Sequence, residues 1–139
     1  MKKASTSPAS LSEKLLRGDL MVASCPSREV LQHVTSRWGV LVLIALGEGT
    51  HRFSALRRLV GGVSERMLAQ TLQRLEHDGL VDRVAYAVVP PHVEYSLTPL
   101  GRQAEARVRA LADWIETSMP AIAHHRSGAR DGAAATTSL

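Results

Sequence analysis

The residues best suited to recognition chemistry lie in the segment 64–79, SERMLAQTLQRLEHDG. If this segment is a helix, turning by about 100° per residue, Leu68, Leu72 and Leu75 share one face. The opposite face carries long hydrogen-bonding side chains and no carboxylate: Arg66, Gln70, Gln73, Arg74 and His77. Arginine and glutamine pair with guanine and adenine edges and also hold phosphates. The pattern is that of a helix able to read DNA, but a solvated surface helix is the commoner cause of these two faces, so the neighbouring sequence has to decide.

Start and stop signals place this segment within a helix-turn-helix. A preceding helix is predicted over 55–60, with Ser54 as its cap and Gly61-Gly62 as its end. Ser64 is expected to cap the next helix. Two helices joined by a short turn that contains glycine form a helix-turn-helix.

The flanking segments predict the rest of the fold. The expected elements are a short helix over 11–20, a helix capped by Ser27 and running to about 35, an apolar helix over 38–46 closed by Gly47 and Gly49, strands over 80–86 and 93–97, and a last helix from Thr98-Pro99 to Pro120. Prolines at 90 and 91 forbid a continuous strand and predict a hairpin with a protruding wing. The expected fold class is mainly α with a small β-hairpin, a winged helix-turn-helix with an extra helix at each end.

Composition predicts how the chain is divided and where it works. Residues 1–11 are expected to form a flexible arm, 12–120 the domain, and 121–139 a disordered tail. The net charge of +4 favours a polyanionic partner, although a GC-rich genome also produces an Arg-rich, Lys-poor chain. The single cysteine excludes an internal disulfide and indicates a reducing compartment. Without a signal peptide, and with 40–46 too short to span a bilayer, we expect a cytoplasmic protein with no membrane partner.

A series of motifs runs through residues 25–114 without a large gap. They are Cys25-Pro26, Arg37-Trp38-Gly39, Arg52-Phe53-Ser54-Ala55-Leu56-Arg57-Arg58, Leu75-Glu76-His77-Asp78-Gly79-Leu80-Val81 and Val89-Pro90-Pro91-His92-Val93-Glu94-Tyr95-Ser96-Leu97-Thr98. In this order they resemble the HxlR-type regulators, which share the architecture of the MarR group. The resemblance implies a bacterial transcription regulator, by default a repressor, that binds operator DNA as a homodimer. It also implies that the flanking helices make most of the dimer contact.

In such a fold the first turns of the helix over 65–78 enter the major groove. Arg66 and Gln70 are therefore predicted to read base edges, each good contact adding about 1–3 kcal/mol of discrimination. The predicted phosphate contacts are Arg52, Arg57, Arg58, Ser64, Gln73 and Arg74. For the first three, the alternative is a salt-bridged surface. The wing residues, expected over the adjacent minor groove unless they form only a hairpin tip, are Arg83, Pro90, Pro91 and His92.

Three residues are candidates for an effector or redox site. Cys25 precedes a predicted helix start, where helix amides favour the thiolate, and some relatives sense oxidants through a cysteine near this position. The alternative is a small buried hydrophobe at the dimer interface. Trp38 and Trp114 could flank a small-molecule ligand, with core packing as the simpler alternative.

Other functional classes find little support. We find no nucleophile elbow, phosphate-binding glycine loop, paired-carboxylate motif or metal-ligand spacing, so no enzyme, cofactor or metal is expected. The remaining alternative is a winged helix that only binds proteins. Such a module would carry acidic or apolar side chains where this chain carries arginine and glutamine.

Overall fold

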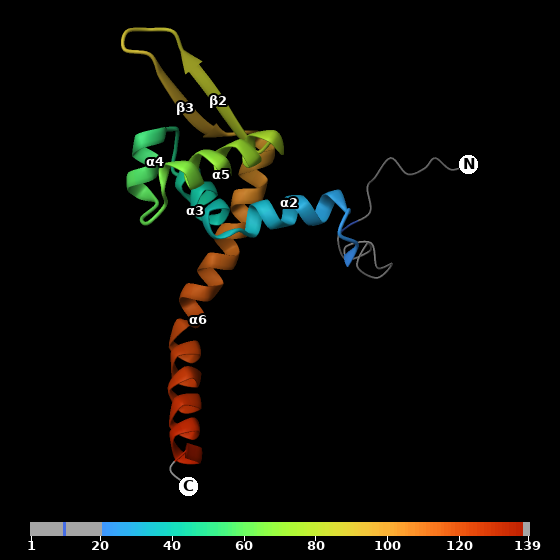
Figure 1. Cartoon of the computed structure of the whole chain (residues 1–139), viewed down its shortest axis with the longest axis vertical. Helices are drawn as coiled ribbons and strands as arrows, with labels where there is room; N and C mark the ends of the chain where they lie inside the picture. Colours follow the sequence, from blue (N-terminus) through green and yellow to red (C-terminus); the bar gives the residue numbers. More distant parts are fainter. Residues whose placement is uncertain (1–9, 11–20, 138–139) are drawn as a thin grey trace, which may run out of the picture.

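The computed structural model describes residue 10 and residues 21–137 of the chain (Figure 1). The elements are α2 (Pro26–Thr35), α3 (Arg37–Gly47), β1 (His51–Arg52), α4 (Phe53–Leu59), α5 (Glu65–His77), β2 (Val81–Tyr86), β3 (His92–Leu97) and α6 (Pro99–Thr137). The helix predicted over 11–20 lies outside the described residues, as does nearly all of the predicted N-terminal arm. The rest forms a winged helix-turn-helix, so the predicted fold class is confirmed.

The core forms where α3, α4 and α5 meet the base of the hairpin. Leu68, Leu72 and Leu75 of α5 are each at most 1% exposed, which confirms the predicted apolar face. They pack in one cluster with buried residues of α3, α4, the strands and α6. Full burial of a leucine side chain is worth about 1.5–3 kcal/mol. Three leucines on one face therefore hold α5 firmly while its other face stays in solvent.

The hairpin extends away from this core as a long projection (Figure 1). Its strands pair antiparallel from Val81 opposite Leu97 to Tyr86 opposite His92, which confirms the predicted hairpin. The sequence analysis missed β1, whose two residues pair with Tyr95 and Glu94 to give the strand order β1-β3-β2. A two-residue strand is too short to show a periodic pattern.

Two of the predicted helix caps are confirmed. The Ser64 side chain accepts a hydrogen bond from the backbone N–H of Met67 at 3.1 Å. The Thr98 hydroxyl accepts from the backbone N–H of Gly101 at 2.9 Å. Each cap satisfies an amide that the first turn of a helix leaves without a partner.

Two other predicted caps are wrong. The helix predicted to be capped by Ser27 begins two residues earlier than expected, at Pro26, with Cys25 in the cap position. The fixed φ of proline suits the first helical position, and its missing N–H costs nothing there. Similarly, α4 begins at Phe53 after Arg52, so Ser54 lies inside the helix. In neither case does the residue in the cap position make a side-chain capping bond.

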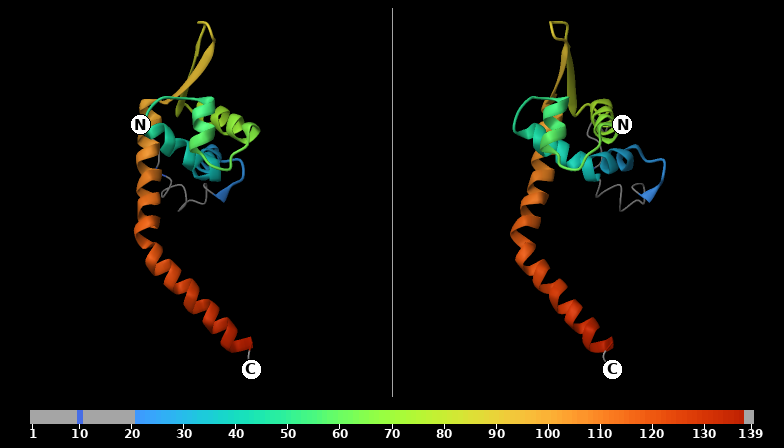
Figure 2. Two further views of the ribbon diagram at one scale, coloured as in Figure 1. Left: turned by 90° about the vertical axis from the view of Figure 1, so that its left-hand side faces the viewer. Right: turned by 60° about the vertical axis from the view of Figure 1, so that its left-hand side comes forward.

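The last helix does not end at Pro120 as predicted, but continues to Thr137. Residues 121–137, predicted as disordered, are therefore helical in the structure. Proline removes one backbone hydrogen bond and bends a helix, and Figure 2 shows that α6 changes direction along its length. The flanking sequence is rich in alanine, the strongest helix former, which favours continuation past the proline.

Close contacts fix α6 against the domain. A Cβ placed on Gly101 would lie 1.9 Å from the carbonyl oxygen of Leu80, so only glycine allows this approach. Further along, the Arg109 guanidinium donates to Glu105 at 2.6 Å and to Glu48, the residue that follows α3, at 3.0 Å. The hydrogen bond to Glu105 is the main cause that raises the pKa of Arg109 above its ordinary value. The first turns of α6 therefore belong to the winged domain.

No single helix in the described part of the chain has the length and apolar composition needed to cross a membrane. Only the pair α2 and α3, bent by 69° at their junction, passes such a test together.

Candidate nucleic-acid interface

The start of α5 presents its polar side chains to solvent. The turn before it contains Gly62, whose φ of +89° suits glycine, and the buried Val63 anchors the turn to the core. Ser64 then caps the helix, so Arg66 is its second residue and Gln70 follows one turn later. Both side chains are exposed. This geometry can present a guanidinium and an amide side by side to a groove.

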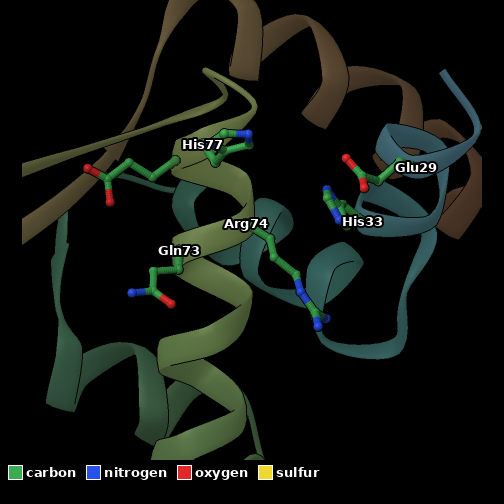
Figure 3. A pocket seen from close by; sticks show the side chains of 6 residues that line it. Glu29, His33, Gln73, Arg74 and His77 are labelled. Carbon is green, nitrogen blue, oxygen red and sulfur yellow. The ribbon is translucent and has the colours of Figure 1, made fainter. Parts of the chain in front are cut away.

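The later part of the same face is more mixed in charge. Figure 3 shows Gln73 and Arg74 leaving α5 on different sides, with Arg74 extending toward α2. The cavity there has a volume of about 650 Å³. Its lining residues are Glu29, His33, Gln73, Arg74, Glu76 and His77. Two carboxylates, those of Glu29 and Glu76, thus line the same cavity as Arg74.

The arginines before α5 are distributed over two elements. Arg52 lies in β1 opposite Glu94, and Arg57 and Arg58 lie in the last turn of α4, all three exposed. Arg57 Nη1 lies 3.7 Å from Glu65 Oε1, and both side chains are well exposed. An ion pair of this kind contributes about 0–1 kcal/mol, so it leaves Arg57 able to exchange partners.

Several guanidinium groups keep their charge unpaired. In the part of the chain that the structure describes, Arg58, Arg66 and Arg74 have no acidic side chain within ion-pair distance. Unpaired arginines on the surface of α4 and α5 are compatible with a nucleic-acid partner.

The wing carries its charge on its strands and none at its tip. Arg83 is exposed on β2, whereas His92 is engaged within the hairpin: its ring stacks on Tyr86 at 4.9 Å, and its Nε2 lies 3.3 Å from Glu94. The tip consists of the apolar residues 87–91, and Val89 is 99% exposed. The prolines thus form an uncharged tip, and His92 stabilises the hairpin beneath it.

The candidate effector residues lie on three different helices. Cys25 is 9% exposed at the start of α2. Trp38 of α3 packs against the core beneath the Arg37 guanidinium, 4.8 Å from the ring centroid, whereas Trp114 of α6 is 60% exposed. No group of three or more metal-ligating side chains occurs among the residues with described positions.

Two features of this region escaped the sequence analysis. An apolar cavity of about 510 Å³ separates α2 from α6, lined in part by Val30, Leu31 and Val108. In addition, His33 Nδ1 lies 2.6 Å from Asp78 Oδ2 and joins α2 to the end of α5. These two residues are 45 positions apart, and nothing in either local pattern signals the contact.

Comparisons with known proteins agree with this geometry. A model of the HxlR-like helix-turn-helix family matches residues 33–123. The HTH-type transcriptional regulator YtfH of Escherichia coli (strain K12) is 67% identical over 116 residues, which cover 84% of this chain and 92% of that protein. Among solved structures, the putative transcriptional regulator ytfH from Salmonella typhimurium aligns with a TM-score of 0.74 at 67% identity, covering 78% of this chain and 96% of that one. The redox regulator HypR in its oxidized form aligns with a TM-score of 0.62 at 38% identity, covering 67% and 96%.

Proposed function

This chain belongs to the HxlR-like helix-turn-helix family of transcription regulators, and on that premise we propose that it is a repressor that binds a pseudo-palindromic operator as a homodimer. A small-molecule or redox signal releases it from the DNA. In each protomer α5 enters the major groove, Arg66 and Gln70 read base edges, and the arginines of β1 and α4 hold phosphates.

The observation that carries the proposal is the outward face of α5. Arg66 and Gln70 are exposed one helical turn apart, and no carboxylate separates them along that face. The Ser64 cap and three buried leucines fix the helix from below, so the two side chains are presented in a defined geometry. A recognition helix requires both properties, a rigid base and long donors on its free face.

Exposed apolar side chains on the flanking helices support the homodimer. Along α6, Leu100, Leu111, Trp114 and Ile115 are all at least 40% exposed. Val30 and Leu31 of α2 are also exposed beside the apolar cavity. An apolar surface of this kind indicates a partner, and a second copy places two copies of α5 about a two-fold axis. The operator half-sites are then about one helical turn apart.

A redox signal would act at Cys25, at the start of α2. The similar protein HypR is a redox regulator with a solved oxidized form, and Cys25 occupies a helix start. In the proposed step two Cys25 thiols, one from each protomer, form a disulfide and pass two protons and two electrons to an oxidant such as diamide. Operator release by diamide in the wild type but not in Cys25→Ser supports this signal. Release that is equal in both proteins assigns Cys25 to packing.

A gel shift with the DNA upstream of the chain's own gene tests the main proposal. We expect a sequence-specific complex whose affinity falls steeply with salt, since phosphate contacts release counterions. Random DNA of equal length is the control. If no specific complex forms under either reducing or oxidising conditions, the protein-interaction module is the better description.

A further inference from the structure

The helix α2 is held to the winged domain with little apolar packing. None of its residues is fully buried, and Val34 is only partly buried against the core. Across the 650 Å³ cavity described above, α2 faces the recognition helix α5. Figure 3 shows His33 on the α2 side of this cavity. The position of α2 relative to α5 therefore depends strongly on polar contacts between them.

The contact between His33 and Asp78 is short and shielded from solvent. His33 Nδ1 lies 2.6 Å from Asp78 Oδ2, and the two side chains are 16% and 5% exposed. A carboxylate oxygen accepts hydrogen bonds, so Nδ1 carries the hydrogen in this contact. A hydrogen bond of this length to a carboxylate is among the stronger ones in proteins.

Asp78 occupies a position that needs such a partner. It is the residue that closes α5, where the helix dipole is negative and disfavours a carboxylate. A shielded carboxylate without a donor is costly to the folded state. Removing the His33 donor therefore destabilises this end of α5 selectively.

The same turn links α5 to the wing and to α6. Leu80 donates its backbone N–H to Leu75 at 2.9 Å, and β2 begins at the next residue. The Thr98 hydroxyl donates to the carbonyl of Gly79 at 2.6 Å, just before α6 begins. A displacement of Asp78 thus acts on the end of the recognition helix, the base of the wing and the start of α6 together.

We propose that His33 is a positioning residue, which couples the position of α2 to the orientation of the recognition helix through its hydrogen bond to Asp78. The inference rests on the proposed function, in which α2 belongs to the dimer and α5 reads the operator. When an effector or a partner protomer moves α2, this bond transmits the movement to α5. The bond is the link between the signal and the DNA-reading surface.

Three variants test this role. His33→Leu removes the N–H donor and keeps most of the side-chain volume. His33→Asn restores an N–H donor, because its side-chain amide nitrogen can occupy the place of Nδ1. Val42→Ala, which truncates a buried side chain of α3 away from the cavity beside α2, is the control for a general loss of stability. Operator affinity, random-DNA affinity and Tm are measured for each.

We expect His33→Leu to lower operator affinity about tenfold, the equivalent of one lost base contact, while random-DNA affinity changes less than about twofold. His33→Asn should regain most of the loss. Val42→Ala should lower Tm without changing the ratio of operator to random-DNA affinity. An unchanged ratio in His33→Leu, or an equal change in Val42→Ala, overturns the proposal.

Hydrogen exchange of the DNA-free protein separates this inference from the proposed function. Exchange of the amides of residues 78–80 should accelerate in His33→Leu by at least about tenfold and return toward the wild-type rate in His33→Asn. If the wild-type protein binds no DNA sequence specifically, the proposed function fails. The exchange rates of residues 78–80 still show whether His33 stabilises the end of α5. Unchanged protection at 78–80 in His33→Leu refutes the proposed coupling.

Discussion

Replacing Arg66 with alanine removes the side chain that we propose to read a base. Arg66 is the second residue of α5, exposed, and without an acidic partner among the residues that the structure describes. A bidentate contact to a base is worth about 1–3 kcal/mol, and a dimer makes it twice, so operator binding should lose about 2–6 kcal/mol. At 1.4 kcal/mol per factor of ten, this is a loss of about 30-fold to 10⁴-fold in operator affinity.

The assay is fluorescence anisotropy with an operator fragment located by footprinting, beside a random fragment of equal length and over a series of salt concentrations. Random-DNA affinity should change little in Arg66→Ala, because it depends on phosphate contacts. Arg126→Ala, in the distal part of α6, is the control of equal charge. If Arg66→Ala weakened operator and random DNA by the same factor, Arg66 would be a phosphate contact and our assignment of base reading would be refuted.

Three further predictions concern stability and assembly. Gly101→Ala should lower the free energy of unfolding by about 1–3 kcal/mol or more, because its Cβ would collide with the carbonyl oxygen of Leu80. Gly128→Ala, in the same helix with nothing within 4 Å, should be neutral or stabilising, and equal Tm values for the two variants would contradict this reasoning. Ser64→Ala should cost about 1 kcal/mol in urea unfolding, since Met67 loses its acceptor; wild-type stability would show that the cap contributes nothing. Trp114→Glu should shift the protein from dimer to monomer in light scattering, and a persistent dimer would exclude this face of α6 from the interface.

The parts of the fold that were predictable from sequence have strong local signals. Each of these signals affects only residues a few positions away in the chain. Examples are the leucine spacing of α5, the caps Ser64 and Thr98, and the prolines of the wing. Arg66 and Gln70 could also be placed, because a helical period assigns them to the face opposite the buried leucines. Their roles at a base edge stay predictions.

The features that the sequence analysis missed depend on competing local signals or on contacts between segments that are distant in the chain. Pro120 is a helix-breaking signal, but the helix-forming residues around it prevail and α6 continues. Pro26, rather than the better capping residue Ser27, sets the start of α2 because its backbone is already shaped for a first turn. The bond from His33 to Asp78 and the strand β1 exist only after distant segments have come together, so no local pattern encodes them.

The length of α6 has a consequence for how assembly can be observed. Its 39 residues correspond to about 58 Å of continuous helix, and most of residues 121–129 are exposed in the protomer. A helical segment as short as 121–129 is marginal in water on its own, and its end frays unless another surface packs along it. If the proposed homodimer packs along this segment, the far-ultraviolet circular dichroism per residue should decrease in magnitude as the protein is diluted. The ellipticity would then report the self-association of this chain without DNA or a label.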